Sequence, residues 1–288
     1  MVNRKFDDYI RVGYSQTEYV NSIDEIGHNI IRETLRKVGV FTKGIDIVYM
    51  SDVLPRKWGT GLGFSSSLTV GLLNALYTLK GENISSSRLA EEACEIEIEV
   101  LDSPIGKQDQ YAAAFGGLNF IKFHSDETVT LDNLNLKSEQ LLEINSKLLL
   151  FYTGLSSESS VVLKEQKVNT ETNKSTINNI DKMVEIAEKL NTDFLSGKFS
   201  NLGTRLREGW NLKKNLASKI SNTKIDEYYN SAIDSGAIGG KILGSGGGGF
   251  ILLYADPKDH FKVRKSLKDL KELDFNLSNK GSEVIVNI

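Results

Sequence analysis

The sequence predicts an α+β fold with two domains, on two observations. Strand-like and helix-like segments are mixed along the chain without a regular strand–helix–strand repeat. Near residues 150–155 the texture changes, from short strands and glycine-rich turns to long polar amphipathic helices with few glycines. We therefore expect an N-terminal domain over residues 1–153 and a C-terminal domain over residues 154–288. A chain of 288 residues with 40% hydrophobic residues can bury a core in each.

The first domain is expected to open with strands and continue with helices. Apolar residues recur every three or four positions between Ile23 and Val38, which predicts a helix that Gly39 ends. Ser85 to Ser87 are N-cap candidates for a later helix. The expected elements, in order, are a strand at 10–15, a helix at 23–38, a strand at 45–50, a buried helix at 67–80, a helix from about 85 to 101, a strand pair at 117–123 and 129–134, and a strand at 147–154.

The second domain begins with helices and ends with strands. The expected elements are long helices between about 159 and 218, a helix at 225–236, a glycine run at 244–249, a strand at 250–255 (FILLYA), a helix at 260–270 and a closing strand at 282–288 (SEVIVNI).

The bulk composition excludes several classes of protein. The net charge of −3 and the pI near 5.8 disfavour a nucleic-acid-binding face. Cys94 is the single cysteine, so an internal disulfide is impossible and a reducing, cytoplasmic setting is expected. The first fifteen residues lack the apolar core of a signal peptide, and no apolar run reaches the roughly 18 residues of a membrane span. The three histidines are widely spread and suggest no metal cluster.

Residues 55–71 read PRKWGTGLGFSSSLTVG and have the layout of an anion site. A strand, then glycines, then a helix start lets backbone N–H groups approach an anion, and the helix terminus adds partial positive charge. The serine hydroxyls could also reach a metal ion bound to phosphate. The stretch has neither the lysine of the Walker motif nor the dinucleotide fingerprint. The alternative is a flexible serine-rich loop before a helix that the serines cap.

The second glycine run, GSGGGG at 244–249, formally matches G-x-G-x-x-G. A dinucleotide fingerprint must follow a strand and open a helix, whereas this run follows a helix-like segment and opens the strand FILLYA. We therefore reject that interpretation. A plain turn is the alternative to our preferred one, a loop in which the backbone passes close to another group.

Two carboxylates stand out in the acidic segment at 89–117. On a helical wheel Glu97 lies at the edge of an apolar stripe, where a carboxylate is costly unless it is paired or binds a cation. Glu92, Glu95 and Glu99 cluster away from the stripe and are expected to be solvated. Asp109 lies in a turn-like segment, PIGKQDQ, and could accept a proton from a hydroxyl. The alternative for Glu97 is that its side chain reaches solvent at the edge of the apolar stripe. The alternative for Asp109 is that it caps the N-terminus of a helix. A phosphate cradle, hydroxyls and two carboxylates together indicate phosphoryl transfer.

These motifs resemble the GHMP kinase family. PRKWGTGLGFSSS is similar to the family's phosphate loop, and GGKILGSGGGGF to its C-terminal glycine motif. PIGKQDQYAAAFGGLNFI, YTG near residue 152 and GW-x-LK-x-x-LA at 209–217 most resemble the heptose phosphate kinases within it. The resemblance implies an N-terminal domain like domain 2 of ribosomal protein S5 and a ferredoxin-like C-terminal domain.

The resemblance also implies roles for individual residues. Asp109 would activate the acceptor hydroxyl, and Ser65 and Glu97 would bind Mg²⁺. The cofactors would be ATP and Mg²⁺, the partner a small sugar or sugar phosphate, and the protein a monomer or homodimer that binds neither nucleic acid nor membrane. The residues expected to hold or support the ATP phosphates are Gly59, Gly61, Leu62, Gly63, Ser65, Ser66, Gly244, Gly246 and Gly247.

The sequence departs from the family pattern at four places. The first serine after GLG is Phe64, three extra residues stand between Asp52 and Gly59, LSSES follows YTG where relatives carry an arginine, and the N-terminal Arg-x-Pro…Gly-Gly-Gly-Thr-Asp motif is absent. On this pattern the first strands of the domain would be missing. Two functions follow: a kinase that phosphorylates a sugar hydroxyl, such as the C1 hydroxyl of a heptose 7-phosphate, or a truncated relative that binds nucleotide with little or no activity.

Overall fold

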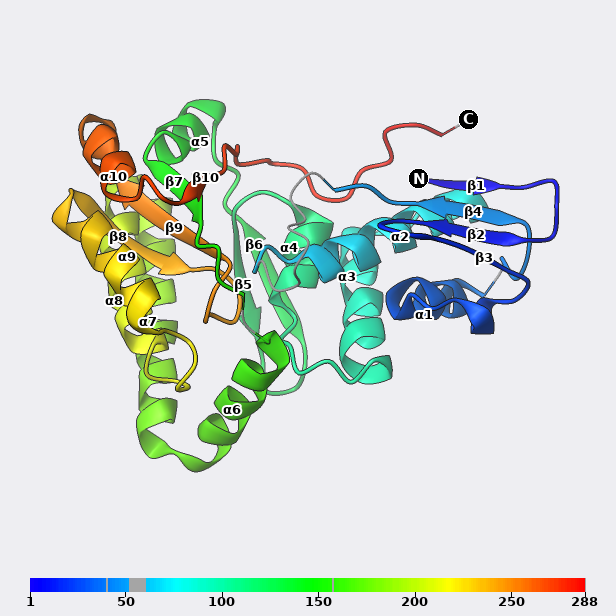
Figure 1. Cartoon of the computed structure of the whole chain (residues 1–288), viewed down its shortest axis with the longest axis horizontal. Coiled ribbons are helices and arrows are strands. Elements are labelled where there is room, and N and C mark those ends of the chain that lie inside the picture. The colour runs from blue at the N-terminus through cyan, green and yellow to red at the C-terminus, as the bar shows by residue number, and fades with distance from the viewer. Residues whose placement is uncertain (40, 52–60, 157, 288) are drawn as a thin grey trace. The chain divides into compact units, whose positions relative to one another are not determined.

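The computed structural model describes residues 1–39, 41–51, 61–156 and 158–287 (Figure 1). The described residues form two compact units. Unit 1 holds residues 1–51, 63–119 and 278–287, and unit 2 holds residues 61–62 and 120–277. The units thus interleave along the chain, whereas the sequence predicts a single boundary after residue 153. The mixture of helices and sheets confirms the α+β expectation.

Unit 1 is built on a four-stranded sheet with the order β1-β4-β2-β3. Strand β2 pairs with β4 in parallel and with β3 in antiparallel orientation. Residues on one face of β2 and β4 are fully buried, among them Ile10, Val12, Ile45 and Ile47. The elements of unit 1 are β1 (Val2–Arg4), β2 (Ile10–Gly13), β3 (Thr17–Val20), a 3₁₀ turn (Ile23–Glu25), α1 (Asn29–Val38), β4 (Ile45–Val48), α2 (Phe64–Lys80), α3 (Ser86–Cys94), a π-helical segment (Glu95–Val100) and α4 (Gln108–Phe115).

The helices of unit 1 follow the sequence pattern, with instructive differences. α1 ends at Gly39 as expected, but it begins only at Asn29, because the apolar residues before it form a separate 3₁₀ turn. Ser85 caps α3 by accepting a hydrogen bond from the N–H of Arg88. The last three residues of the turn-like segment PIGKQDQ form the first turn of helix α4. α1 and α2 pack against each other beside the sheet (Figure 1).

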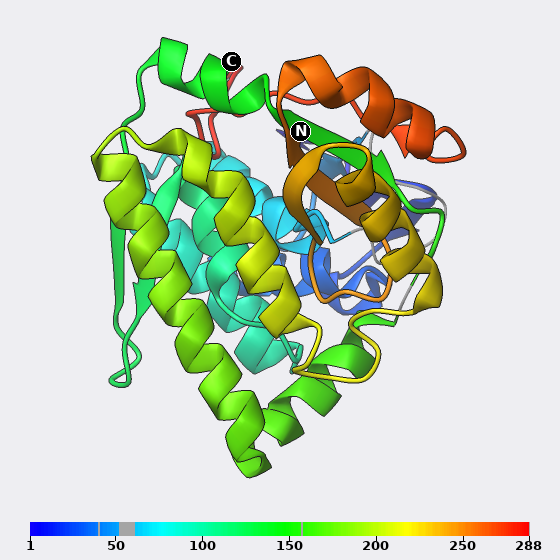
Figure 2. The same ribbon diagram turned by 90° about the vertical axis from the view of Figure 1, so that its left-hand side faces the viewer.

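Unit 2 is built on a second four-stranded sheet with the order β10-β7-β9-β8, in which all described neighbours are antiparallel. Helix α8 packs on β8, and α7 lies alongside α8 (Figure 2). The elements between residues 119 and 272 are β5 (Asn119–Phe123), β6 (Val129–Asn133), α5 (Ser138–Asn145), β7 (Leu148–Tyr152), α6 (Ser159–Thr172), α7 (Lys174–Leu195), a 3₁₀ turn (Phe199–Asn201), α8 (Leu202–Lys213), α9 (Thr223–Asp234), β8 (Ala237–Ile242), β9 (Phe250–Ala255), a 3₁₀ turn (Pro257–Asp259), α10 (His260–Ser266) and β10 (Lys271–Glu272).

The second glycine run connects two strands of this sheet. The segment before it was expected to be helix-like, but Ala237–Ile242 is strand β8, which pairs with β9. The expected helix at 225–236 is present as α9, but the expectation that the glycine run follows a helix-like segment was wrong. AIGGKI gains its strand conformation from pairing with FILLYA and has little strand propensity of its own. The run is therefore a hairpin loop, and the rejection of a dinucleotide fingerprint stands.

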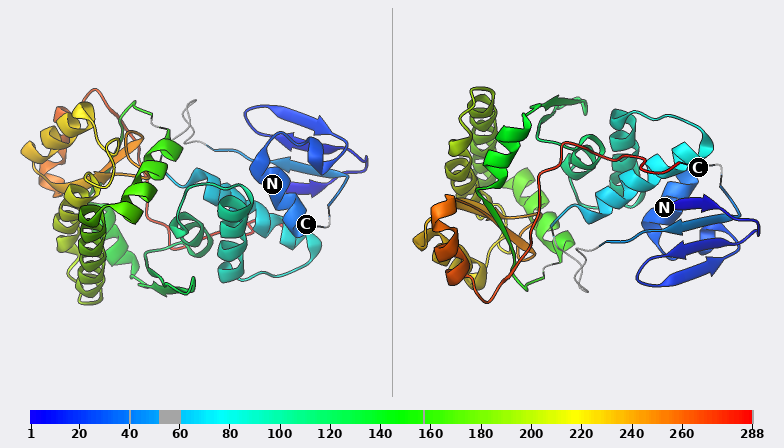
Figure 3. Two further views of the ribbon diagram at one scale, coloured as in Figure 1. Left: turned by 90° about the horizontal axis from the view of Figure 1, so that it is seen from below. Right: turned by 90° about the horizontal axis from the view of Figure 1, so that it is seen from above.

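The C-terminal segment returns from unit 2 to unit 1 without forming the expected closing strand. Its described part, residues 282–287, pairs with no described strand. Instead it runs along the helices of unit 1 (Figure 3). The side chain of Asn74, on α2, donates to the carbonyl oxygen and the hydroxyl of Ser282 at 3.2 and 3.0 Å. The N–H of Gly117 donates to the carbonyl oxygen of Ser278.

Gly116, just after α4, is expected to be intolerant of a side chain. Its φ is +62°, and a Cβ there would lie 2.1 Å from the backbone nitrogen of Gly281. The Gly116→Ala variant must displace the C-terminal segment, so we expect a loss of at least about 2 kcal/mol of unfolding free energy, measured by urea denaturation. Gly71→Ala is the matched control. Gly71 lies inside α2 with open space at its Cβ, so alanine should leave stability unchanged or raise it by about 0.5–1 kcal/mol.

Candidate active site

The N-terminus of α2 carries the described part of the glycine–serine stretch. Gly63 is the N-cap residue, and no side chain caps the helix or places a negative charge in its first turn. The helix has 17 residues and begins at Phe64, three residues earlier than expected. Ser65 and Ser66 therefore belong to its first turn. This contradicts the alternative in which the serines form a flexible loop before the helix and cap its N-terminus. An uncapped helix N-terminus presents backbone N–H groups and partial positive charge, which suits an anion.

Phe64 belongs to an aromatic group beside this terminus. Its ring centroid lies 5.8 Å from that of Tyr49, which stacks on Tyr14 at 5.8 Å and 8°. His28 meets Tyr14 edge to face at 5.1 Å. All four side chains are half-buried. Phe64 has no hydroxyl, but as the first residue of α2 it keeps its backbone N–H at the helix terminus.

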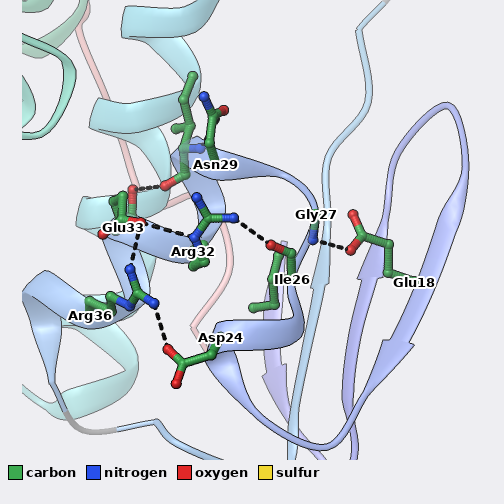
Figure 4. Close-up of polar contacts among 10 residues, drawn as sticks. Glu18, Asp24, Ile26, Gly27, Asn29, Arg32, Glu33 and Arg36 are labelled. Atoms are coloured by element: carbon green, nitrogen blue, oxygen red, sulfur yellow. Dashed lines mark hydrogen bonds and ion pairs between the residues drawn. The ribbon is translucent and has the colours of Figure 1, made fainter. Parts of the chain in front are cut away.

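The segment before α1, which includes His28, is held by polar contacts between Glu18 and Gly27 and between Arg32 and Ile26 (Figure 4). Glu18 accepts hydrogen bonds from the N–H of Gly27 at 2.6 Å and from the hydroxyl of Tyr14 at 2.7 Å. Burial alone would raise the pKa of Glu18, but these bonds lower it overall. Arg32 donates to the carbonyl oxygen of Ile26 at 2.8 Å. Burial lowers the pKa of His28 and so disfavours the charged form of the imidazole.

Glu97 is a buried carboxylate, only 2% exposed. This excludes the alternative in which it reaches solvent at the rim. Gln110 of α4, itself fully buried, donates from Nε2 to Glu97 Oε2 at 2.7 Å. Across the described residues no basic side chain forms an ion pair with Glu97. A carboxylate held in this way is a suitable ligand for a divalent cation.

The helix that carries Glu97 is not a regular α-helix. After Cys94 it widens into a π-helical segment over Glu95–Val100. Such a bulge shifts the faces on which later residues point, and it is common at functional sites. The bulge re-aims Glu97 toward Gln110, a change that a regular helical wheel cannot represent.

The neighbouring acids have mixed positions. Glu99 is exposed as expected, and Glu95 pairs with Lys37. The expectation for Glu92 was wrong: it is 9% exposed and accepts hydrogen bonds from Tyr77 and Arg88 at 2.7 and 2.8 Å. Burial, together with the bond to Glu92, raises the pKa of Tyr77 to about 12. These contacts tie α3 to α2 and are structural.

Asp109 lies against the N-cap of α2. A Cβ built on Gly63 would meet the carboxyl carbon of Asp109 at 3.4 Å, so the carboxylate stands beside the point where the helix begins. Asp109 is the second residue of α4 and caps nothing, because the N-cap residue is Lys107 and no side chain caps this helix. The carboxylate is half-buried, which leaves it accessible to a small molecule.

In unit 2 the two glycine segments touch each other. Gly61 has a φ of +72°, and a Cβ on it would lie 2.5 Å from the carbonyl oxygen of Leu243. A Cβ on Gly244 would lie 2.5 Å from the Cα of Gly61. Neither position can accept a side chain without moving backbone. These contacts support the interpretation that the second glycine run is a loop whose backbone passes close to another group. That group is the backbone of the first glycine segment.

The remainder of the hairpin loop is held from two sides. The N–H of Gly247 donates to the carbonyl oxygen of Ile220 at 2.8 Å. On the other side Thr153, buried in the YTG segment, donates through both its N–H and its hydroxyl to the carbonyl oxygen of Gly249 at 2.9 and 2.8 Å. The N–H of Gly249 donates to the carbonyl oxygen of Leu155. The YTG segment and the glycine run, far apart in sequence, thus form one structure.

The structure therefore brings the expected residues together in two sets. In unit 1 Gly63 meets Asp109, and Ser65 and Ser66 lie in the same helix turn that Gly63 caps. In unit 2 Gly61 meets Gly244. Gly59 lies outside the described residues. Within the described ranges no group of three metal-binding side chains occurs, and no helix is long and apolar enough to cross a membrane. The roles of these residues remain predictions.

The comparison with protein families decides the affiliation. The family model for the N-terminal domain of GHMP kinases matches residues 25–117, and the model for the GHMP kinase C-terminal domain matches residues 183–272. The chain belongs to the GHMP kinase family. The two matched ranges include both glycine segments as well as Glu97 and Asp109.

Individual GHMP kinases are similar over most of the chain. A D-glycero-alpha-D-manno-heptose 7-phosphate kinase of Campylobacter jejuni is 31% identical over 77% of this chain and 66% of its own length. A galactokinase of Pyrococcus furiosus is 28% identical over 71% of this chain and 63% of its own length. This GHMP kinase chain therefore spans about two thirds of these relatives.

Solved structures confirm the two-domain GHMP kinase fold. A D-glycero-D-manno-heptose 1-phosphate kinase from Bacteroides thetaiotaomicron superposes with a TM-score of 0.75 at 23% identity, covering 97% of this chain and 84% of the other. A Streptococcus pneumoniae phosphomevalonate kinase in complex with phosphomevalonate and AMPPNP gives a TM-score of 0.74 at 16% identity, covering 95% and 88%.

Gln110 is the residue of this site that the sequence analysis missed. It directly follows Asp109, and its side chain is the hydrogen-bond partner of Glu97. The available signal was a glutamine just before Tyr111 and three alanines, in a segment otherwise suited to burial. A buried glutamine needs a polar partner, and that requirement points to Glu97 once α4 is recognised as a helix.

Proposed function

We propose that this GHMP kinase transfers the γ-phosphoryl group of ATP to a hydroxyl of a sugar phosphate, with the C1 hydroxyl of a heptose 7-phosphate as the first candidate. The observation that carries the proposal is the position of Asp109 beside Gly63, at the N-terminus of α2. The proximity supports the proposal, because a carboxylate beside a helix terminus suited to anions would accept the proton of a hydroxyl that attacks a phosphoryl group there.

The residues fit the expected cofactors. The helix terminus and the glycine segments offer backbone N–H groups for phosphate oxygens. Ser65 and the buried Glu97 would hold Mg²⁺, which supplies charge neutralisation at the phosphates when bound. The half-buried aromatic group of Tyr14, His28, Tyr49 and Phe64 adjoins the helix and has the chemistry to contact a planar base.

In the reaction, the Asp109 carboxylate would accept a hydrogen bond from the acceptor hydroxyl and take its proton as the new O–P bond forms. The bond between the γ-phosphorus and the β,γ-bridging oxygen of ATP breaks in the same step, and ADP leaves. Backbone N–H groups at the start of α2 would stabilise the negative charge on the transferred group. Gln110 would keep Glu97 oriented. Positioning and electrostatics provide most of the rate in this type of reaction. The heptose phosphate acceptor is inferred from the likeness to the Campylobacter jejuni enzyme. We also propose that the protein acts in the cytoplasm.

A relative that binds nucleotide without turnover is the second candidate, favoured by Phe64, which stands where the family's phosphate loop has a serine. One experiment separates the two. The purified protein is incubated with Mg²⁺, ATP and a panel of heptose and hexose phosphates, and ADP is quantified with and without each sugar. The kinase proposal expects sugar-dependent ADP formation with kcat of about 1–100 s⁻¹. Folded protein that binds ATP but forms no ADP with any sugar would support the second candidate.

A further inference from the structure

Lys213 lies at the point where the two glycine segments meet. It is the last residue of α8 and is half-buried. Its Nζ donates to the carbonyl oxygen of Gly244 at 2.5 Å. Gly244 in turn is in backbone contact with Gly61. An ammonium group is therefore attached to the turn that touches the phosphate-loop segment.

The end of a helix is a common place for lysine, because it complements the helix dipole or binds the last carbonyl groups of its own helix. Lys213 does something different, since the carbonyl group that it binds lies 31 residues away on a hairpin loop. The adjacent residue shows the ordinary behaviour: Lys214 reaches Asp226 at 3.6 Å, in a partly exposed ion pair. The two neighbouring lysines thus have distinct surroundings, and one of them is directed at the glycine segments.

The turn that Lys213 binds depends on a fixed backbone path. Leu243 and Gly244 approach Gly61 so closely that neither glycine could bear a Cβ. A bond from a cation to the carbonyl oxygen of Gly244 fixes this turn from the side of α8, as Ile220 and Thr153 fix its later residues. A bond between a charged donor and a carbonyl oxygen is stronger than a neutral one.

We propose that Lys213 is a positioning residue for the nucleotide phosphates: it fixes the Gly244 turn against Gly61 and supplies positive charge at the phosphate loop. The inference rests on the proposed function, because it takes Gly61 as part of an ATP phosphate loop. The chemical group that Lys213 would help to bind is a phosphate. We assign this phosphate to the nucleotide and not to the sugar, because the turn that Lys213 holds contacts Gly61, a residue of the first glycine segment.

The test compares ligands with and without phosphates. Binding of Mg²⁺-AMPPNP and of adenosine is measured by calorimetry for wild type, Lys213→Met, Lys213→Arg and the control Lys214→Met. Lys213→Met should weaken AMPPNP binding by about 10-fold or more, because a bond from a charged group is lost, while adenosine binding changes by less than about twofold. Lys213→Arg keeps the charge and should stay within about threefold of wild type, and Lys214→Met should match wild type.

Kinetics add a second readout. Lys213→Met should raise KM for ATP with less change in KM for the sugar phosphate. If Lys213→Met does not fold, Lys213→Gln replaces it: the amide can still donate to Gly244, the charge is gone, and AMPPNP binding should still weaken by about fivefold or more.

The outcomes separate the hypotheses. Equal weakening of AMPPNP and adenosine would overturn the inference, since it would indicate general damage to the fold. Unchanged AMPPNP binding with a raised KM for the sugar phosphate, but not for the unphosphorylated sugar, would overturn it in favour of an acceptor phosphate. If wild type binds AMPPNP and Lys213→Met binds it equally well, only the role of Lys213 fails. Wild type that binds no AMPPNP would refute the proposed function itself.

Discussion

Replacing Asp109 with asparagine or alanine is expected to lower kcat by about 10³-fold or more, while the affinity for ATP changes by less than about threefold. The reason is the place of the carboxylate, in contact with the N-cap Gly63 of α2, where an acceptor hydroxyl would meet the transferred phosphoryl group. A general base contributes roughly 10²–10⁴-fold, and orientation of the hydroxyl adds to that. Asparagine keeps the size of the side chain but cannot accept the proton.

The measurement pairs steady-state ADP formation with calorimetric AMPPNP binding for each variant. Asp102→Asn is the matched control, an exposed acid seven residues earlier with a φ of +49° that asparagine tolerates. It should retain wild-type turnover. Turnover of the Asp109 variants at the wild-type rate would show that Asp109 is not the proton acceptor. Loss of AMPPNP binding together with turnover would instead mean that Asp109 supports the nucleotide site.

The parts of the site that the sequence could predict are those in which local chemistry dominates. Glycines at 61 and 244 were expected to allow close backbone approach, and the structure pairs them with each other. Glu97 was singled out because a carboxylate on the apolar stripe of a helix needs a partner, and it is indeed buried. In both cases the chemistry of a single residue type, a glycine or a buried carboxylate, predicts a close neighbour even though the sequence does not identify that neighbour.

The parts that could not be predicted depend on pairing over long distances. Strand β8 contains two glycines, and only its antiparallel pairing with β9 makes it a strand. Glu92 was expected in solvent, because nothing in its own helix reveals that Tyr77 and Arg88 would enclose it. The residues VIV near the C-terminus have high strand propensity, yet no described strand pairs with them. The strand propensity of a segment shows that it can form a strand, but whether it does so depends on a neighbouring strand with which it can pair.

The partner of Glu97 illustrates a third limit. A helical wheel assumes about 100° per residue, and the π-helical segment from Glu95 to Val100 departs from that geometry. The wheel therefore located Glu97 correctly relative to the apolar stripe but could not tell which neighbour it faces. Gln110, 13 residues further on and on another helix, became visible as its partner only in the structure.

Replacing Glu97 with glutamine is expected to raise the Mg²⁺ concentration needed for half-maximal activity by about 10-fold or more. The carboxylate is 2% exposed and has the amide of Gln110 as a neutral hydrogen-bond partner. Its negative charge is therefore available to a cation, and an amide oxygen is a much weaker ligand for Mg²⁺ than a carboxylate. Saturating Mg²⁺ should restore part of kcat, because the geometry of the site is kept.

Stability separates this effect from damage to the fold. The Oε1 atom of Gln110 is buried, and among the residues that the structure describes none donates a hydrogen bond to it. A glutamine at position 97 carries an amide that can donate to such an acceptor, so the fold of the Glu97→Gln variant should be as stable as wild type in the absence of ligands. In thermal melts, Mg²⁺ with AMPPNP should raise the Tm of wild type more than that of the variant. Glu99→Gln, an exposed neighbour, serves as control and should match wild type in both titrations. If the Glu97→Gln variant folds normally and its Mg²⁺ requirement is unchanged, Glu97 is not a ligand of the metal ion. The hydrogen bond from Gln110 would then be the sole explanation for the burial of its carboxylate.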